Sequence, residues 1–128
     1  MAQARIGLIG LGVMGANLAL NIAENGFPVA VYNRTGSVTD DYIASAGDLA
    51  HNLVPTKTLE DLVASLTKPR AIIIMVQAGG PVDSVIAGLT PLLDKGDMII
   101  DAGNANFHDT RRRDAALSTS GLNFIGMG

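Results

Sequence analysis

Short apolar runs alternate with helix-like patterns along most of this chain, and that alternation predicts a mainly parallel β-sheet with helices on both faces. The expected strands lie at residues 5–9, 29–32, 53–54, 71–76, 98–101 and 123–125. Helices are expected at about residues 13–25, 40–45, 58–68, 81–92 and 109–117. The predicted fold class is therefore α/β, as a doubly wound sheet of the Rossmann type.

The residues between 58 and 76 lead to three more specific expectations. Thr58 can cap a helix, and the carboxylates of Glu60 and Asp61 suit its first turn. Pro69 is expected to end that helix, because proline does not continue one. The run at residues 71–76 lacks apolar–polar alternation, so both faces of this strand should be buried.

The junction between the first strand and the first helix carries the pattern Gly-x-Gly-x-x-Gly, formed by Gly10, Leu11, Gly12, Val13, Met14 and Gly15. In such a motif Gly10 permits the tight turn, Gly12 leaves bare backbone for a pyrophosphate, and Gly15 allows close helix packing. The phosphates would sit at the positive end of the helix dipole. A ligand-free glycine-rich turn is the alternative, but the flanking strand, helix and second strand favour a dinucleotide.

The end of the second strand indicates which dinucleotide is bound. An NAD-binding fold usually has an Asp or Glu there, which holds the 2′-hydroxyl of the ribose. This chain has Asn33, Arg34 and Thr35 instead. Because an arginine at this place suits a 2′-phosphate, the sequence predicts NADP as the cofactor.

Composition narrows the remaining classes of function. The length of 128 residues fits one domain, and 48% hydrophobic with 16% charged residues is typical of a globular protein. The net charge of −3 argues against nucleic acid as a partner, and no long apolar run predicts a membrane partner. With no cysteine, the chain has neither disulfides nor a thiol metal site. A cytoplasmic enzyme domain without metal is expected.

Several other residues have two readings from sequence alone. Met14 either packs on a flat ring or belongs to the core. Asn104 follows a predicted strand, so it either reaches a nicotinamide or a substrate hydroxyl or bonds its own turn. His51 and His108 have no carboxylate or second imidazole at ligand spacing, so neither is expected to bind metal or act as a base.

From about residue 4 to its end, the chain resembles the N-terminal domain of the 6-phosphogluconate dehydrogenases. The matching motifs are Gly7 through Leu18, Tyr32 through Thr35, IIIMVQAG from Ile72 to Gly79, DMIIDAGN from Asp97 to Asn104, and Asp109 through Arg112. Other β-hydroxyacid dehydrogenases share the first motif but not the asparagine-centred one with its following Asp-Thr-x-Arg. Several motifs in the same order make the resemblance specific.

The resemblance implies that NADP is held by Gly10 through Gly15, with Asn33, Arg34 and Thr35 at the 2′-phosphate. It implies further that Val76, Gln77 and Ala78 lie along the adenosine ribose, and that Asn104 touches both nicotinamide and substrate. The chain departs from the family pattern at three positions: Gln77 replaces a usual lysine, Ala105 replaces a usual serine, and Gly12 is often alanine.

The activity that the resemblance implies is oxidation of 6-phospho-D-gluconate at C3, with reduction of NADP and loss of CO2 to give ribulose 5-phosphate. The family's catalytic lysine and glutamate belong to a helical domain after residue 128, through which its dimers form. Residues 1–128 are therefore expected to be a cofactor domain without catalytic residues, inactive alone and homodimeric only in the longer protein. Another NADP-dependent β-hydroxyacid dehydrogenase or imine reductase, or a non-catalytic NADP sensor, are the alternatives.

Overall fold

The computed structural model describes residues 4–76, 80–102, 112 and 121–126 of the chain. Its six strands form one sheet in the order β3-β2-β1-β4-β5-β6, and every neighbouring pair is parallel. The strands are β1 (Ala4–Ile9), β2 (Val29–Tyr32), β3 (Leu53–Thr56), β4 (Leu66–Ile74), β5 (Met98–Asp101) and β6 (Asn123–Gly126). The predicted doubly wound α/β class is confirmed.

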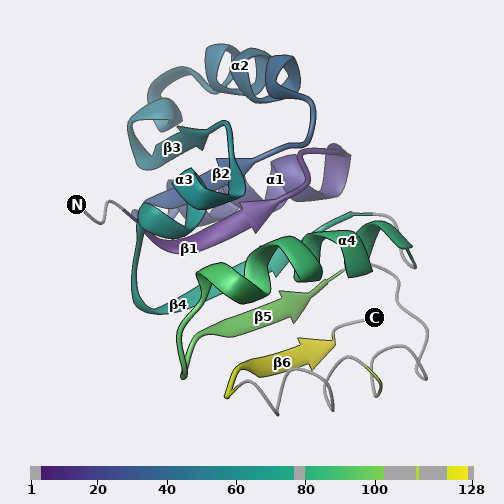
Figure 1. Ribbon diagram of the computed structural model, residues 1–128. Helices are drawn as coiled ribbons and strands as arrows, with labels where there is room; N and C mark the ends of the chain where they lie inside the picture. The colour runs from purple at the N-terminus through teal and green to yellow at the C-terminus, as the bar shows by residue number, and fades with distance from the viewer. Residues whose placement is uncertain (1–3, 77–79, 103–111, 113–120, 127–128) are drawn as a thin grey trace.

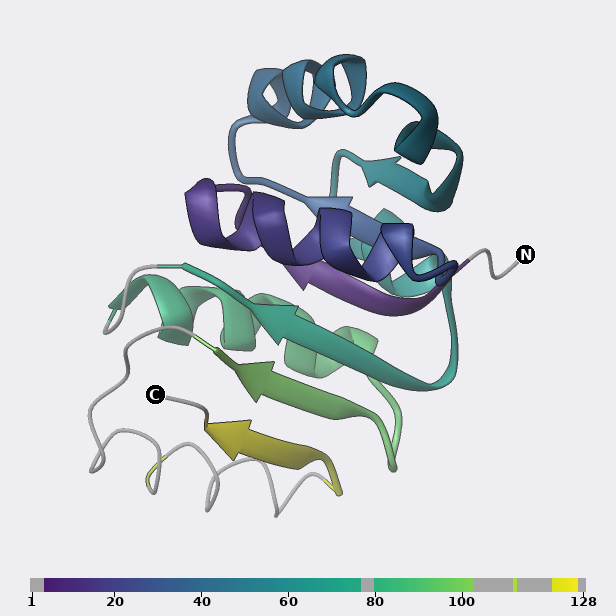
Figure 2. The same ribbon diagram turned by 180° about the vertical axis from the view of Figure 1, so that it is seen from behind.

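Helices cover both faces of this sheet. The α-helices are α1 (Val13–Glu24), α2 (Gly36–Ser45), α3 (Leu59–Ala64) and α4 (Gly80–Leu89), and the 3-10 helices are η1 (Gly47–Asn52) and η2 (Thr90–Leu92). Helices α3 and α4 lie on the near face in Figure 1, and α1 lies on the opposite face, which Figure 2 turns toward the viewer. Parallel strands require such crossover connections, which place helices over the faces of the sheet.

Two apolar clusters fill the space between the sheet and its helices. On the α3 and α4 face, Leu62 and Leu89 pack with Ile72 and Ile74 of β4. On the other face, Ala19 and Ala23 of α1 pack with residues of β1 and β2 that include Leu8, Val29 and Val31. Small residues on α1 allow this helix to approach the sheet closely, and the loop before it is held near the strand ends.

The boundary between α3 and β4 differs from the prediction. Thr58 caps α3 as predicted, since its hydroxyl accepts a hydrogen bond from the Asp61 amide at 3.0 Å. The prediction that Pro69 ends this helix was wrong, because α3 ends at Ala64 and Pro69 lies within β4. Pairing of β4 with β5 begins only at Ala71, so a proline two residues earlier removes no hydrogen bond from that ladder.

The bounds of two other elements, α2 and β4, also differ from the prediction. Helix α2 begins at Gly36, directly after the loop that follows β2, rather than near residue 40. Strand β4 extends from Leu66 to Ile74, so Val76 lies in the loop after it rather than in the strand. Of the helix expected at residues 109–117, the structure describes Arg112, which is helical, and the other positions lie outside the described residues.

A buried aspartate holds the amino ends of β4 and β5 together. The carboxylate of Asp97 accepts hydrogen bonds from the Arg70 amide at 2.8 Å, the Arg70 guanidinium at 3.1 Å and the Asp94 amide at 2.9 Å. Asp97 is 1% exposed, and a buried carboxylate is stable only when its oxygens are satisfied in this way. The ionic contacts of β4 with β5 thus lie at the amino edge of the sheet, away from the strand ends considered below.

Tyr42 links α2 to α1 and makes stability depend on pH. Its hydroxyl donates to the Ala16 carbonyl at 2.7 Å, and burial raises the pKa of Tyr42 from 10.0 to about 12. The folded state therefore favours the neutral phenol. Its contribution should be complete below pH 10 and should decrease by about 2 kcal/mol as the pH rises from 10 to 12.

Urea unfolding of the wild type and Tyr42→Phe across this pH range measures that contribution. At neutral pH the variant should be less stable by about 1 kcal/mol, because the hydrogen bond is lost. The difference should shrink above pH 10, since only the wild type must bury a titrating phenol. A difference that stays constant would show that the phenol ionises as easily in the fold as in the unfolded chain.

Candidate nucleotide-binding site

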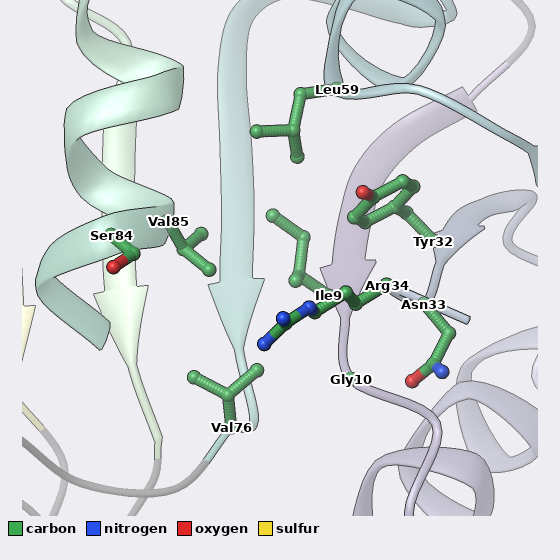
Figure 3. A pocket seen from close by; sticks show the side chains of 9 residues that line it. All are labelled: Ile9, Gly10, Tyr32, Asn33, Arg34, Leu59, Val76, Ser84 and Val85. Atoms are coloured by element: carbon green, nitrogen blue, oxygen red, sulfur yellow. The ribbon is translucent and has the colours of Figure 1, made fainter. Parts of the chain in front are cut away.

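A cavity of about 650 Å³ lies at the carboxyl ends of β1, β2 and β4, where the order of the strands reverses direction. In open α/β sheets, ligands bind at this topological switch point. Figure 3 shows the side chains that surround the cavity. The lining residues are Ile9, Gly10, Tyr32, Asn33, Arg34, Leu59, Val76, Ser84 and Val85. Most are apolar, and Arg34 is the one charged residue among them.

Gly10 makes the turn out of β1 that brings the chain to this cavity. Its φ of +103° lies in the region that favours glycine, and its amide donates to the Tyr32 carbonyl at 2.9 Å. A Cβ atom at Gly10 would lie 2.4 Å from the Met75 carbonyl oxygen. The turn that the sequence predicted at Gly10 is therefore present, and no other residue fits there without movement of the backbone.

Gly15 allows α1 to pack against its own preceding loop. A Cβ atom at this position would lie 1.9 Å from the Gly10 carbonyl oxygen and 3.3 Å from Cβ of Met75. The predicted close approach is thus confirmed, but the contact is with the loop and the residue after β4 rather than with a strand. It fixes where the first turn of α1 lies relative to the ends of β1 and β4.

Gly12 differs from these two glycines because the fold does not require it. It precedes α1 as the N-cap, in extended backbone with φ of −67°, and an added Cβ atom would meet nothing within 4 Å. The first helical hydrogen bond runs from the Ala16 amide to the Gly12 carbonyl at 2.8 Å, so the amides of the first turn have no partner within the helix. Open space beside such amides suits an anion.

The two residues after Gly12 are apolar and exposed. Val13 is 81% exposed and Met14 is 72% exposed. The reading of Met14 as a core residue is therefore excluded, and its side chain remains available for contact with a ligand or another part of the protein. No acidic residue lies in the first turn of α1, so nothing there would repel a phosphate.

The segment after β2 places two polar side chains in opposite directions. Figure 3 shows the Arg34 guanidinium extending into the cavity toward Val76, whereas the Asn33 amide turns toward the glycine-rich loop. Asn33 Oδ1 accepts a hydrogen bond from the Leu11 amide at 2.9 Å, and Asn33 Nδ2 donates to the Thr35 carbonyl at 3.3 Å. Arg34 is exposed at the rim, where it can meet an anion.

The structure brings only part of the predicted residue set together. Gly10, Asn33, Arg34 and Val76 line the same cavity, and Gly12 faces open space beside it. Thr35 does not line the cavity and is instead the N-cap of α2. Leu11 has a buried side chain and an amide already bound to Asn33, so it supports the loop rather than offering a contact. Gln77, Ala78, Asn104 and His108 lie outside the described residues.

Sequence reasoning missed five lining residues, namely Ile9, Tyr32, Leu59, Ser84 and Val85. Leu59 is the first residue of α3, and Ser84 and Val85 lie in the middle of α4. The helix after a parallel strand starts at the same edge as the strand ends, so the early helix position of Leu59 was a usable signal. The apolar residues of this set form cavity walls against which a flat ring can pack.

Two expected absences concern metal and membrane. Within residues 4–76, 80–102, 112 and 121–126, no group of three or more His, Asp or Glu side chains is placed to hold a metal ion. The His51 ring contacts the Asp48 carbonyl in η1 and does not line the cavity. None of the described helices is both long and apolar enough to cross a bilayer.

Comparison with known proteins supplies the family. Residues 5–128 match the family model described as the NAD binding domain of 6-phosphogluconate dehydrogenase. The decarboxylating 6-phosphogluconate dehydrogenases of Lactococcus lactis subsp. lactis (strain IL1403) and Synechococcus elongatus are each 56% identical over 128 residues, which is 100% of this chain and 27% of each relative. The chain thus spans about a quarter of the length of these curated relatives.

Solved structures agree with this assignment. A Plasmodium falciparum 6-phosphogluconate dehydrogenase, described in its apo form, with its cofactor NADP+ and with its substrate 6-phosphogluconate, is 39% identical with a TM-score of 0.87. The match covers 94% of this chain and 26% of that one. A Mycobacterium tuberculosis 3-hydroxyisobutyrate dehydrogenase is 19% identical with a TM-score of 0.81, covering 97% of this chain and 40% of that one, and shares the fold.

Proposed function

The chain belongs to the NAD binding domain family of 6-phosphogluconate dehydrogenase, and we propose that it binds NADP as the cofactor domain of a decarboxylating 6-phosphogluconate dehydrogenase. The observation that carries the choice of NADP is Arg34, which is the one charged side chain among the described residues that line the cavity. No acidic residue stands in the segment 33–35 to receive a ribose 2′-hydroxyl. A guanidinium at this place favours a phosphate instead.

The residues present fit the parts of this cofactor. The open space beside Gly12 and the free amides of the first turn of α1 suit the pyrophosphate. The apolar walls formed by Leu59, Val76 and Val85 suit the adenosine, with Arg34 at the 2′-phosphate. We assign Thr35 to the 2′-phosphate as well, Gln77 and Ala78 to the adenosine ribose, and Met14 to contact with a flat ring of the cofactor.

The proposed reaction of the whole protein is oxidation of 6-phospho-D-gluconate at C3, followed by loss of CO2 to give ribulose 5-phosphate. Bound NADP supplies the hydride acceptor. In this division of labour, residues 1–128 hold and orient the cofactor, and Asn104 orients both nicotinamide and substrate. An amide cannot accept the proton of the substrate hydroxyl, so the acid–base groups belong to the longer protein. We further propose that the whole enzyme is a cytoplasmic homodimer.

The 128-residue chain alone should bind NADP but should not oxidise 6-phosphogluconate. General acid–base help contributes about 10²–10⁴-fold to such reactions, and a second domain is needed to enclose the substrate. The assay follows NADPH absorbance for this chain and for a version extended to the length of its relatives. Turnover by the 128 residues that matched the extended protein would mean that a catalytic group lies within them, with His108 the first to replace.

A further inference from the structure

Two consecutive amides of the glycine-rich loop are bound to the end of β2. The Gly10 amide donates to the Tyr32 carbonyl, and the Leu11 amide donates to Asn33 Oδ1, each at 2.9 Å. The first bond joins two backbone groups and depends on neither side chain. The second depends on the side chain of Asn33, which lies 22 positions along the chain from its partner. Asn33 is therefore the side chain that fastens the loop to β2.

This hydrogen bond also determines which end of the Asn33 amide is available to a ligand. The Leu11 amide is a donor, so the group facing it must be the oxygen, because a flipped amide would place two donors against each other. The nitrogen then lies on the side of Thr35, to whose carbonyl it donates at 3.3 Å. A primary amide has a second N–H that this bond leaves unused.

We propose that Asn33 is a positioning residue with two effects, an inference that rests on the proposed binding of NADP. First, it holds the loop at residues 10–12 in the arrangement that receives the pyrophosphate. Second, because its oxygen faces the Leu11 amide, its nitrogen lies beside Thr35 and adds a donor at the end of β2 to that of the Arg34 guanidinium. Donors suit a 2′-phosphate, whereas an acceptor is what a 2′-hydroxyl requires.

Calorimetric titration of three variants with NADP and with NAD distinguishes the two roles. The variants are Asn33→Ala, Asn33→Asp and Arg34→Ala. Asn33→Ala frees the loop, which both nucleotides use, so the affinity for NAD should fall by a factor of about three to ten. The affinity for NADP should fall by at least that factor, because a donor to its 2′-phosphate is lost as well. Arg34→Ala should weaken NADP alone. Asn33→Asp keeps an oxygen for the Leu11 amide and adds a charged acceptor, so NAD should bind at least as tightly as to the wild type while NADP weakens about tenfold or more.

Hydrogen exchange of the Leu11 amide gives a readout that needs no cofactor. Exchange should be faster in Asn33→Ala and close to wild type in Asn33→Asp. Loss of NADP affinity alone in Asn33→Ala, with Leu11 exchange unchanged, would overturn the positioning role and leave Asn33 as a simple phosphate contact. A wild type that bound neither nucleotide would instead refute the proposed function, and the exchange comparison would still decide whether Asn33 fastens the loop.

Discussion

Replacement of Gly12 by valine should abolish NADP binding while the domain stays folded. An added side chain at Gly12 meets nothing within 4 Å, and the extended backbone there accepts a β-branched residue. The valine would instead fill the space through which a pyrophosphate approaches the first turn of α1. Hydrogen bonds to a charged group contribute about 1.5–3 kcal/mol each, so exclusion of the phosphates should cost about a hundredfold in affinity or more.

Gly10→Val is the matched control for this experiment. It adds the same side chain two residues earlier, where φ is +103° and a Cβ atom would lie 2.4 Å from the Met75 carbonyl oxygen. This variant should lose stability, whereas Gly12→Val should keep the circular dichroism spectrum of the wild type and lose at most a few degrees of melting temperature, because valine is a poorer N-cap than glycine. Normal NADP binding by Gly12→Val, or its unfolding, would refute the assignment of the open space to the pyrophosphate.

Replacement of Arg34 by alanine should reduce the affinity for NADP about tenfold to a hundredfold and leave the affinity for NAD within about twofold. The reason is the loss of one charge-assisted contact, which is worth about 1.5–3 kcal/mol and exists only when a 2′-phosphate is present. Because Arg34 is exposed and lines a cavity rather than the core, folding should not change.

Arg5→Ala is the control for a general effect of charge. Arg5 is also exposed but lies at the amino end of β1, at the opposite edge of the sheet. Its removal should leave both affinities unchanged. If Arg5→Ala weakened NADP as much as Arg34→Ala did, the preference would come from the overall field of the protein rather than from a contact at the end of β2.

The sequence pattern within a short segment was enough to predict those elements whose structure is decided by residues adjacent in the chain. The strands at residues 29–32 and 98–101 have the predicted bounds, and Thr58 caps α3 as expected. The end of α3 was not predictable in this way, because Pro69 is accommodated by the late start of the β4–β5 ladder. Hydrogen-bond partners that are distant in the chain were not predicted from the sequence either, as for the bonds between Arg70 and Asp97.

The same distinction applies to the candidate site. The turn at Gly10 follows from a motif within one loop, and the place of Arg34 follows from the end of a single strand. The partner of Asn33 and the contributions of Leu59 and Val85 depend on the strand order, which brings β1 between β2 and β4. Deciding between the two interpretations of Met14 required the exposed fraction of its side chain in the structure. Apolar periodicity in the sequence does not separate a core methionine from one beside a ligand.

The most direct test of the cofactor assignment is calorimetric titration of the unmodified 128-residue protein with NADP and, separately, with NAD. If Arg34 and Asn33 present donors to a 2′-phosphate, NADP should bind about tenfold to a hundredfold more tightly than NAD. Equal affinities for the two nucleotides, or tighter binding of NAD, would contradict the account.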